Sequence, residues 1–170
     1  MRRTVNFILM ICCLSISNAQ SGNSTCNTGS QAIVQPFVGE WEESDLKDGS
    51  EVFIGRLSTK LNLDDCVLTQ RFISADSTFK YQSQGFVNPA TQLWEETYVF
   101  NSGRYSKYLW IVDGDVLYTL RIGGSRHIDN QHGLKYIDIR KDQFTVVQEE
   151  SIDGGVTWVK RDTTRIKRLH

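Results

Sequence analysis

From residue 37 onward, apolar and polar residues alternate with a period close to two rather than 3.6, which is typical of β-strands that bury one face. Turn-forming pairs such as Asp48-Gly49 and Asp113-Gly114 interrupt the alternation. Residues 20–35 are polar, and we expect a tail there or a short turn of helix around Ala32–Val34. The alternation predicts ten strands, at residues 38–44, 50–60, 63–73, 78–87, 92–101, 105–112, 115–122, 134–141, 143–151 and 156–167.

Short strands in this number, without a convincing amphipathic helix or an internal repeat, predict an all-β antiparallel meander. A meander of this size must protect its two edges, and closing into a barrel removes them. We therefore predict a closed β-barrel of 8–10 strands over residues 36–170. The interior of such a barrel is just large enough for one small ligand.

The composition fits one globular domain and narrows the class of partner. The chain has 170 residues, of which 39% are hydrophobic and 23% are charged, and this is too short for two ordinary domains. With 19 Lys and Arg against 20 Asp and Glu, and no basic run, the sequence gives no support to a nucleic-acid partner.

The first nineteen residues have the features of a secretory signal peptide. Arg2 and Arg3 precede an apolar run at residues 7–14, and small residues at Ser17 and Ala19 predict cleavage before Gln20. The apolar run is about half of the ~20 residues that a membrane-spanning helix needs. We expect a secreted or periplasmic protein with no membrane span after cleavage.

Two of the four cysteines, Cys26 and Cys66, follow the predicted signal peptide. In an oxidising compartment a pair of cysteines suggests one disulfide, which would stabilise the fold by about 4 kcal/mol through the entropy of the unfolded chain. The alternative is that Cys66 is an ordinary buried strand residue and Cys26 lies in a loose tail.

Aromatic residues recur on the strand faces that we expect to point inward, and these rings predict a partly apolar ligand. Trp94, Glu96 and Tyr98 share one face of their strand, so Glu96 would supply a polar group that fixes the orientation of the ligand. The predicted cavity residues are Phe72, Tyr81, Trp94, Glu96, Tyr98, Trp110 and Tyr118.

Two other functions remain open. Alternation turns one member of Glu95-Glu96 and one of Glu149-Glu150 inward, and inward carboxylates at Glu96 and Glu150 could serve an enzyme of sugars or lipids as acid and base. More often an inward acid is paired with an arginine, here Arg71, Arg121 or Arg161. The other hypothesis is a barrel that binds partners on its surface and whose core is filled by side chains, without a ligand cavity.

Two further motifs have simple structural interpretations. Ser151 to Trp158 matches Ser-x-Asp-x-Gly-x-Thr-Trp, in which Asp153 accepts hydrogen bonds from the turn and Trp158 packs across the hairpin. His127-x-Asp129-x-x-His132 has metal-ligand residue types, but the neighbouring sequence is typical of a loop at a barrel rim. We expect neither a metal nor another cofactor.

The stretch Phe37-Val-Gly39-Glu-Trp41 resembles the first strand of the calycin superfamily, the lipocalins and their relatives. With the Gly-Gly-x-Thr-Trp hairpin at residues 154–158, the chain is similar to secreted bacterial lipocalin-like domains of unknown function. The resemblance implies a lipocalin-like barrel with structural roles for Gly39 and Trp41. It also implies a late basic residue packed over Trp41; Arg165 or Arg168 is placed for this, and we assign it to Arg165. Such barrels serve many functions, so the resemblance implies a fold more than an activity.

If Cys26 and Cys66 are bridged, the chain purified from an oxidising compartment should be lighter than its reduced form by the mass of two hydrogen atoms. Intact mass spectrometry of the denatured protein, before and after reduction, measures this difference. Identical masses would contradict the disulfide.

Overall fold

The computed structural model describes residues 28–114, 116–125 and 131–170. The described chain begins with a short helix, α1 (Thr28–Val34), and a 3-10 turn, η1 (Gln35–Phe37). The strands that follow are β1 (Gly39–Lys47), β2 (Ser50–Asn62), β3 (Val67–Ser74), β4 (Lys80–Val87), β5 (Trp94–Phe100), β6 (Tyr105–Asp113), β7 (Val116–Gly124), β8 (Gln131–Ile137), β9 (Gln143–Ser151) and β10 (Val159–Arg168).

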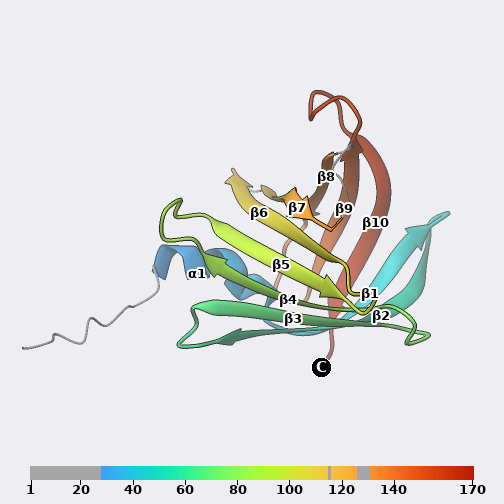
Figure 1. Cartoon of the computed structure of the whole chain (residues 1–170). Helices are drawn as coiled ribbons and strands as arrows, with labels where there is room; N and C mark the ends of the chain where they lie inside the picture. Colours follow the sequence, from blue (N-terminus) through green and yellow to red (C-terminus); the bar gives the residue numbers. More distant parts are fainter. Residues whose placement is uncertain (1–27, 115, 126–130) are drawn as a thin grey trace, which may run out of the picture.

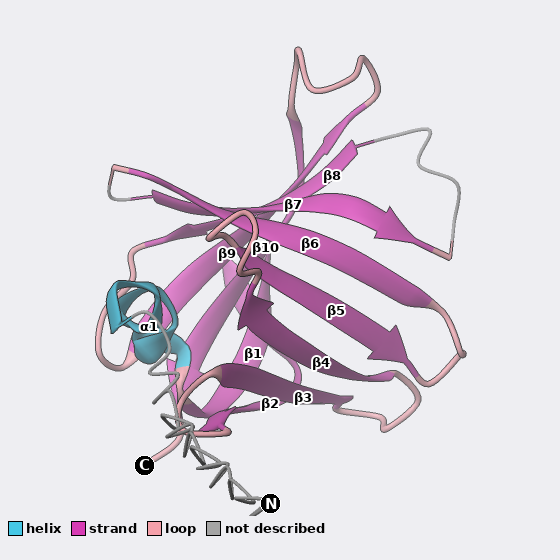
Figure 2. Cartoon of the chain, turned by 60° about the vertical axis from the view of Figure 1, so that its left-hand side comes forward, coloured by secondary structure: helices cyan, strands magenta, loops and turns pink. Residues whose placement is uncertain are grey.

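The strands form one closed barrel (Figures 1 and 2). Each strand pairs antiparallel with the next along the chain, and β1 also pairs with β10. The predicted fold class, a closed antiparallel meander, is therefore confirmed, with ten strands among the described residues. The strand predicted from residue 63 begins only at Val67, because Leu63, Asp64 and Asp65 have positive φ angles of 51°, 54° and 63° and form a turn.

The helix α1 lies at one end of the barrel, which we call the closed end (Figures 1 and 2). Val34 and Phe37 are buried there, so the structure has the helix rather than the tail around Ala32–Val34, and this segment contributes to the core. The ring of Phe37 meets Phe144, Tyr136 and Trp110 edge-on, at centroid distances of 5.0, 5.4 and 5.7 Å. We call the other end, which carries the β1–β2 and β9–β10 hairpins, the open end.

A stacked arginine closes the barrel beside Trp41. The register of β1 and β10 places Arg168 opposite Trp41, and its guanidinium lies 4.0 Å from the centroid of the indole ring. Arg168 also donates hydrogen bonds of 2.9 Å to the carbonyls of Val38 and Lys141. Gly39 has a φ of 146°, and a side chain at this position would collide with the Arg168 guanidinium, so glycine is required there.

The assignment of this role to Arg165 is thereby corrected. Arg165 pairs with Glu51 at 2.8 Å, away from Trp41. The residues that contact Trp41 follow from the register of two strands that are distant in the sequence.

Among the described residues, no helix has both the length and the apolar character that a membrane crossing requires.

We expect Arg168→Ala to lower the free energy of unfolding by about 2–3 kcal/mol, because it removes a cation–π contact and two charged hydrogen bonds. The matched control is Arg165→Ala, which breaks a partly exposed ion pair and should cost about 0.5 kcal/mol. Urea unfolding followed by tryptophan fluorescence measures both variants. Equal losses would contradict the distinction between the two arginines.

Candidate functional site

A packed layer that contains a buried carboxyl separates the closed end from the rest of the interior. Glu96 is 1% exposed, and its oxygens accept hydrogen bonds from Ser83 Oγ at 2.5 Å and from Tyr98 Oη and Trp110 Nε1 at 3.0 Å. Burial raises the pKa of Glu96 to about 7, and the three hydrogen bonds act in the opposite direction. This carboxyl is fully engaged and closed to solvent.

Beyond this layer the barrel encloses a cavity of about 400 Å³. Ligand pockets in proteins span about 300–1,000 Å³, so the cavity has room for a small molecule. Phe37, Tyr136 and Phe144 form its lining toward the closed end. Rings from three adjacent strands form a wall in which Tyr98 packs against both Tyr81 and Tyr108, with centroids 5.2 and 5.3 Å apart.

The Glu43 carboxyl faces this cavity. Glu43 lies two residues after Trp41 on β1, so both side chains point inward. The pairing with β2 shifts register between Glu43 and Ser44, and β-bulges of this kind often redirect a side chain at a functional site. Within the described part of the chain, no group forms a hydrogen bond or an ion pair with the Glu43 carboxyl.

Burial raises the pKa of Glu43 to about 8, and the neighbouring charge of Asp45 raises it further. Burial also raises the pKa of Tyr81, and the charge of Glu43 is the next largest cause. The two groups therefore interact across the cavity. An unpaired carboxyl in such surroundings is costly when it is ionised, so Glu43 is mostly protonated at neutral pH.

His132 is held in the cavity lining by two polar neighbours. Its Nδ1 lies 3.3 Å from Tyr108 Oη, and its Nε2 lies 2.8 Å from Gln148 Nε2. Burial lowers the pKa of His132, and the charge of Arg121 contributes in the same direction. The imidazole is therefore neutral at neutral pH, and it acts in the lining as a hydrogen-bonding group rather than as a cation.

The predicted cavity residues divide into three groups. Tyr81 and Tyr98 line the cavity directly. Trp94, Glu96 and Trp110 are buried in the packed layer, where their contacts are to other core residues. Phe72 also belongs to this second, buried group, with its ring stacked on that of Tyr81 at 5.3 Å.

Tyr118 alone forms the third group: it was predicted to point into the cavity, and the structure places it on the outer face. Its neighbours Leu117 and Thr119 are buried in the interior, and Tyr118 lies on the outer face with Lys135 Nζ 5.6 Å from its ring centroid. Apolar residues occupy both faces of β7, so alternation alone did not distinguish inside from outside.

Glu96 and Glu150 occupy different surroundings. Glu150 Oε2 accepts a 2.8 Å hydrogen bond from Arg161, near the open end of β9, whereas Glu96 is enclosed in the packed layer. Of the two alternatives for Glu150, a catalytic carboxylate or an acid paired with an arginine, the structure shows the pair with Arg161. The buried Glu96 carboxyl offers no oxygen to a substrate in solution.

The β9–β10 hairpin is held by its own side chains. Asp153 accepts hydrogen bonds from the Thr157 hydroxyl and amide and from Ser151 Oγ, and these lower the pKa of Asp153 to about 2. Trp158 donates to the Gly155 carbonyl at 3.1 Å and packs beside Gly133 of β8. This geometry explains the motif without a ligand.

Several predicted features fall outside the described residues. The predicted signal peptide, Cys26, His127 and Asp129 are among them. Cys66 lies half-buried in the turn before β3 rather than within a strand. Its pairing with Cys26 stays a prediction.

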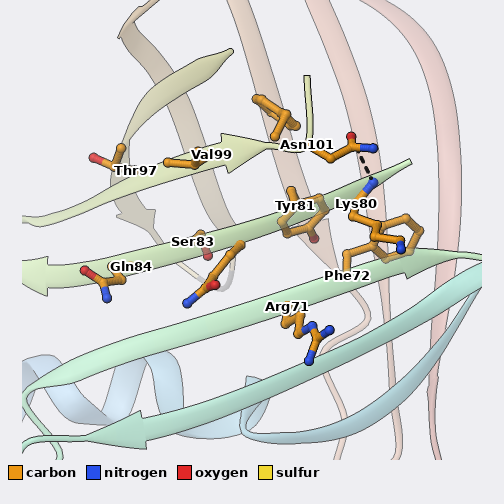
Figure 3. A pocket seen from close by; sticks show the side chains of 11 residues that line it. Arg71, Phe72, Lys80, Tyr81, Ser83, Gln84, Thr97, Val99 and Asn101 are labelled. Carbon is orange, nitrogen blue, oxygen red and sulfur yellow. Dashed lines mark hydrogen bonds between the residues drawn. The ribbon is translucent and has the colours of Figure 1, made fainter. Parts of the chain in front are cut away.

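A separate hollow of about 460 Å³ lies over the outside of β3, β4 and β5 (Figure 3). Exposed side chains such as Arg71 and Gln84 line it, and the buried Ser83 hydroxyl at its edge is already donated to Glu96. Because these polar side chains are exposed and can bond to water, whereas the unpaired Glu43 carboxyl is buried, we place the candidate site inside the barrel.

Glu43 is the functional candidate that the sequence analysis missed. The doublet Glu42-Glu43 has the same form as Glu95-Glu96 and Glu149-Glu150, and it follows Trp41, for which the resemblance implied a structural role. The same alternation therefore carried the signal.

Comparison of the chain with models of known protein families gives no match, and comparison with curated proteins gives none either.

The raised pKa of Glu43 predicts a loss of stability as the pH rises. Between pH 4.5 and about 8 the folded protein keeps a proton that the unfolded chain has released, so the free energy of unfolding falls across this window. Glu96 acts in the same direction up to about pH 7. We expect Glu43→Gln to match the wild type at pH 4.5 and to exceed it by on the order of 1–3 kcal/mol at pH 8.

The control for this experiment is Glu42→Gln on the outer face, where Glu42 lies 3.5 Å from Arg56. Loss of this exposed pair should change stability little at any pH in the window. Urea unfolding at a series of pH values tests both variants. If the difference in the free energy of unfolding between Glu43→Gln and the wild type were the same at every pH, the raised pKa of Glu43 would be ruled out.

Proposed function

We propose that this protein binds a small, largely apolar molecule inside the barrel. The observation that carries the proposal is the combination of a cavity of about 400 Å³, walls of aromatic rings and an unpartnered carboxyl at Glu43. Apolar walls with a few placed polar groups are the usual composition of ligand pockets. A core evolved only for stability would leave neither the volume nor the unpaired carboxyl, because both are costly.

The rings supply the affinity and the polar groups supply the orientation. Each buried aromatic side chain offers a large contact area that loses little conformational entropy on binding. Glu43, His132 and Gln148 reach the cavity from β1, β8 and β9, so a ligand meets hydrogen-bonding groups from separate directions. The predicted signal peptide and the stacking of Arg168 on Trp41 support our further proposal that the protein is a secreted or periplasmic calycin-like barrel.

The experiment uses prodan, a neutral naphthalene dye whose emission increases and shifts to the blue in apolar surroundings. We expect saturable binding to the wild type and at least about tenfold weaker binding to Val146→Phe, whose larger side chain projects into the cavity. The control, Val99→Phe, makes the same change on the outer face of β5, where Val99 is 52% exposed, and should bind as the wild type does.

Circular dichroism and thermal unfolding establish that both variants are folded. Equal binding by Val146→Phe and the wild type would place the dye outside the barrel. No saturable binding to the wild type would favour the alternative of a barrel without a ligand.

A further inference from the structure

We infer that the interior cavity binds an organic amine, whose ammonium group pairs with the Glu43 carboxylate among the aromatic rings. The inference rests on the proposed function and adds the chemical class of the ligand.

The charges around the cavity favour a cation. The described lining contains Glu43 as its acidic residue and no lysine or arginine. Behind the lining, Asp45 lies on the same strand, where Lys47 Nζ is 3.5 Å from its carboxyl, and Glu96 lies in the packed layer. Arg121 is the charged group of opposite sign near His132. An anionic ligand would therefore enter a site whose nearest carboxyl has no cation to balance it.

The walls favour the same class of ligand. Tyr81, Tyr98, Tyr108 and Tyr136 all line the cavity, and the faces of such rings attract cations, most strongly where water is excluded. A neutral apolar ligand would use the contact area of the rings but would leave the Glu43 carboxyl unpaired. An amine uses both, because its N–H groups donate to the carboxylate while its apolar part contacts the rings.

Binding is coupled to one proton. In the empty protein, burial and Asp45 keep the pKa of Glu43 near 8, so the carboxyl is protonated at neutral pH. When a protonated amine enters, Glu43 releases its proton to the solvent and the resulting carboxylate accepts hydrogen bonds from the ammonium group. The other titratable groups of the lining are Tyr81 on β4, Tyr98 on β5, Tyr108 on β6, and His132 and Tyr136 on β8. On β1, Asp45 lies near Glu43 and is paired with Lys47, whereas the facing residues Gly55 of β2 and Ile166 of β10 do not titrate.

The test compares three indoles of similar size by isothermal titration calorimetry: tryptamine as the cation, tryptophol as its neutral counterpart and indolepropionate as the anion. We expect tryptamine to bind at least about tenfold more tightly than tryptophol, and indolepropionate to bind most weakly. The affinity for tryptamine should rise from about pH 6 to about pH 8, whereas that for tryptophol should not.

The variant Glu43→Gln keeps the shape of the side chain and should remove the preference for tryptamine while leaving tryptophol bound. Glu42→Gln, on the outer face of β1, is the matched control and should bind all three indoles as the wild type does. Equal affinities for tryptamine and tryptophol, or an unchanged preference for tryptamine in Glu43→Gln, would overturn the inference that the ligand is an amine. Either result would leave the proposed function intact. If none of the indoles binds and prodan does not bind either, both proposals fail.

Discussion

The first and last strands of the chain, β1 and β10, pair over Trp41–Asp45 and Thr164–Arg168, and the interior of the protein depends on this pairing. Without it the sheet would expose two edges and the inward side chains would face water. Arg168 stacks on Trp41 at the closed end, where Val34 of α1 and Phe37 of η1 also belong to the buried core. Closure therefore creates one filled end and leaves the cavity above it.

Two carboxyls inside this barrel show how the same chemistry can serve structure or a candidate function. Glu96 is satisfied by three donors, and those bonds join β4, β5 and β6. Glu43 has no partner among the described residues and faces the cavity. Burial raises the pKa of both groups, yet only Glu43 has an interaction still to make. The cost of leaving it unpaired is the physical basis of the proposed site.

Much of the fold could be predicted because strands report their buried face directly in the sequence. Alternation with a period of two located all ten strands that the structure describes, although β8 spans Gln131–Ile137 rather than the predicted 134–141. The need to hide sheet edges predicted the closed barrel. The same alternation correctly predicted that Tyr81 and Tyr98 point toward the cavity. It carried the signal for Glu43 as well, since Glu43 lies two residues beyond Trp41 on one strand.

Only the tertiary structure decided the features that depend on which distant strands meet. The inward direction predicted for Tyr118 was wrong because both faces of β7 carry apolar side chains, and a periodic pattern cannot distinguish two apolar faces. Arg168 rather than Arg165 covers Trp41 because the β1–β10 register sets the contact. By itself, the sequence determined the strands and the closed barrel. The cavity and the unpaired Glu43 follow from packing in three dimensions, because an empty volume is the space that no side chain fills.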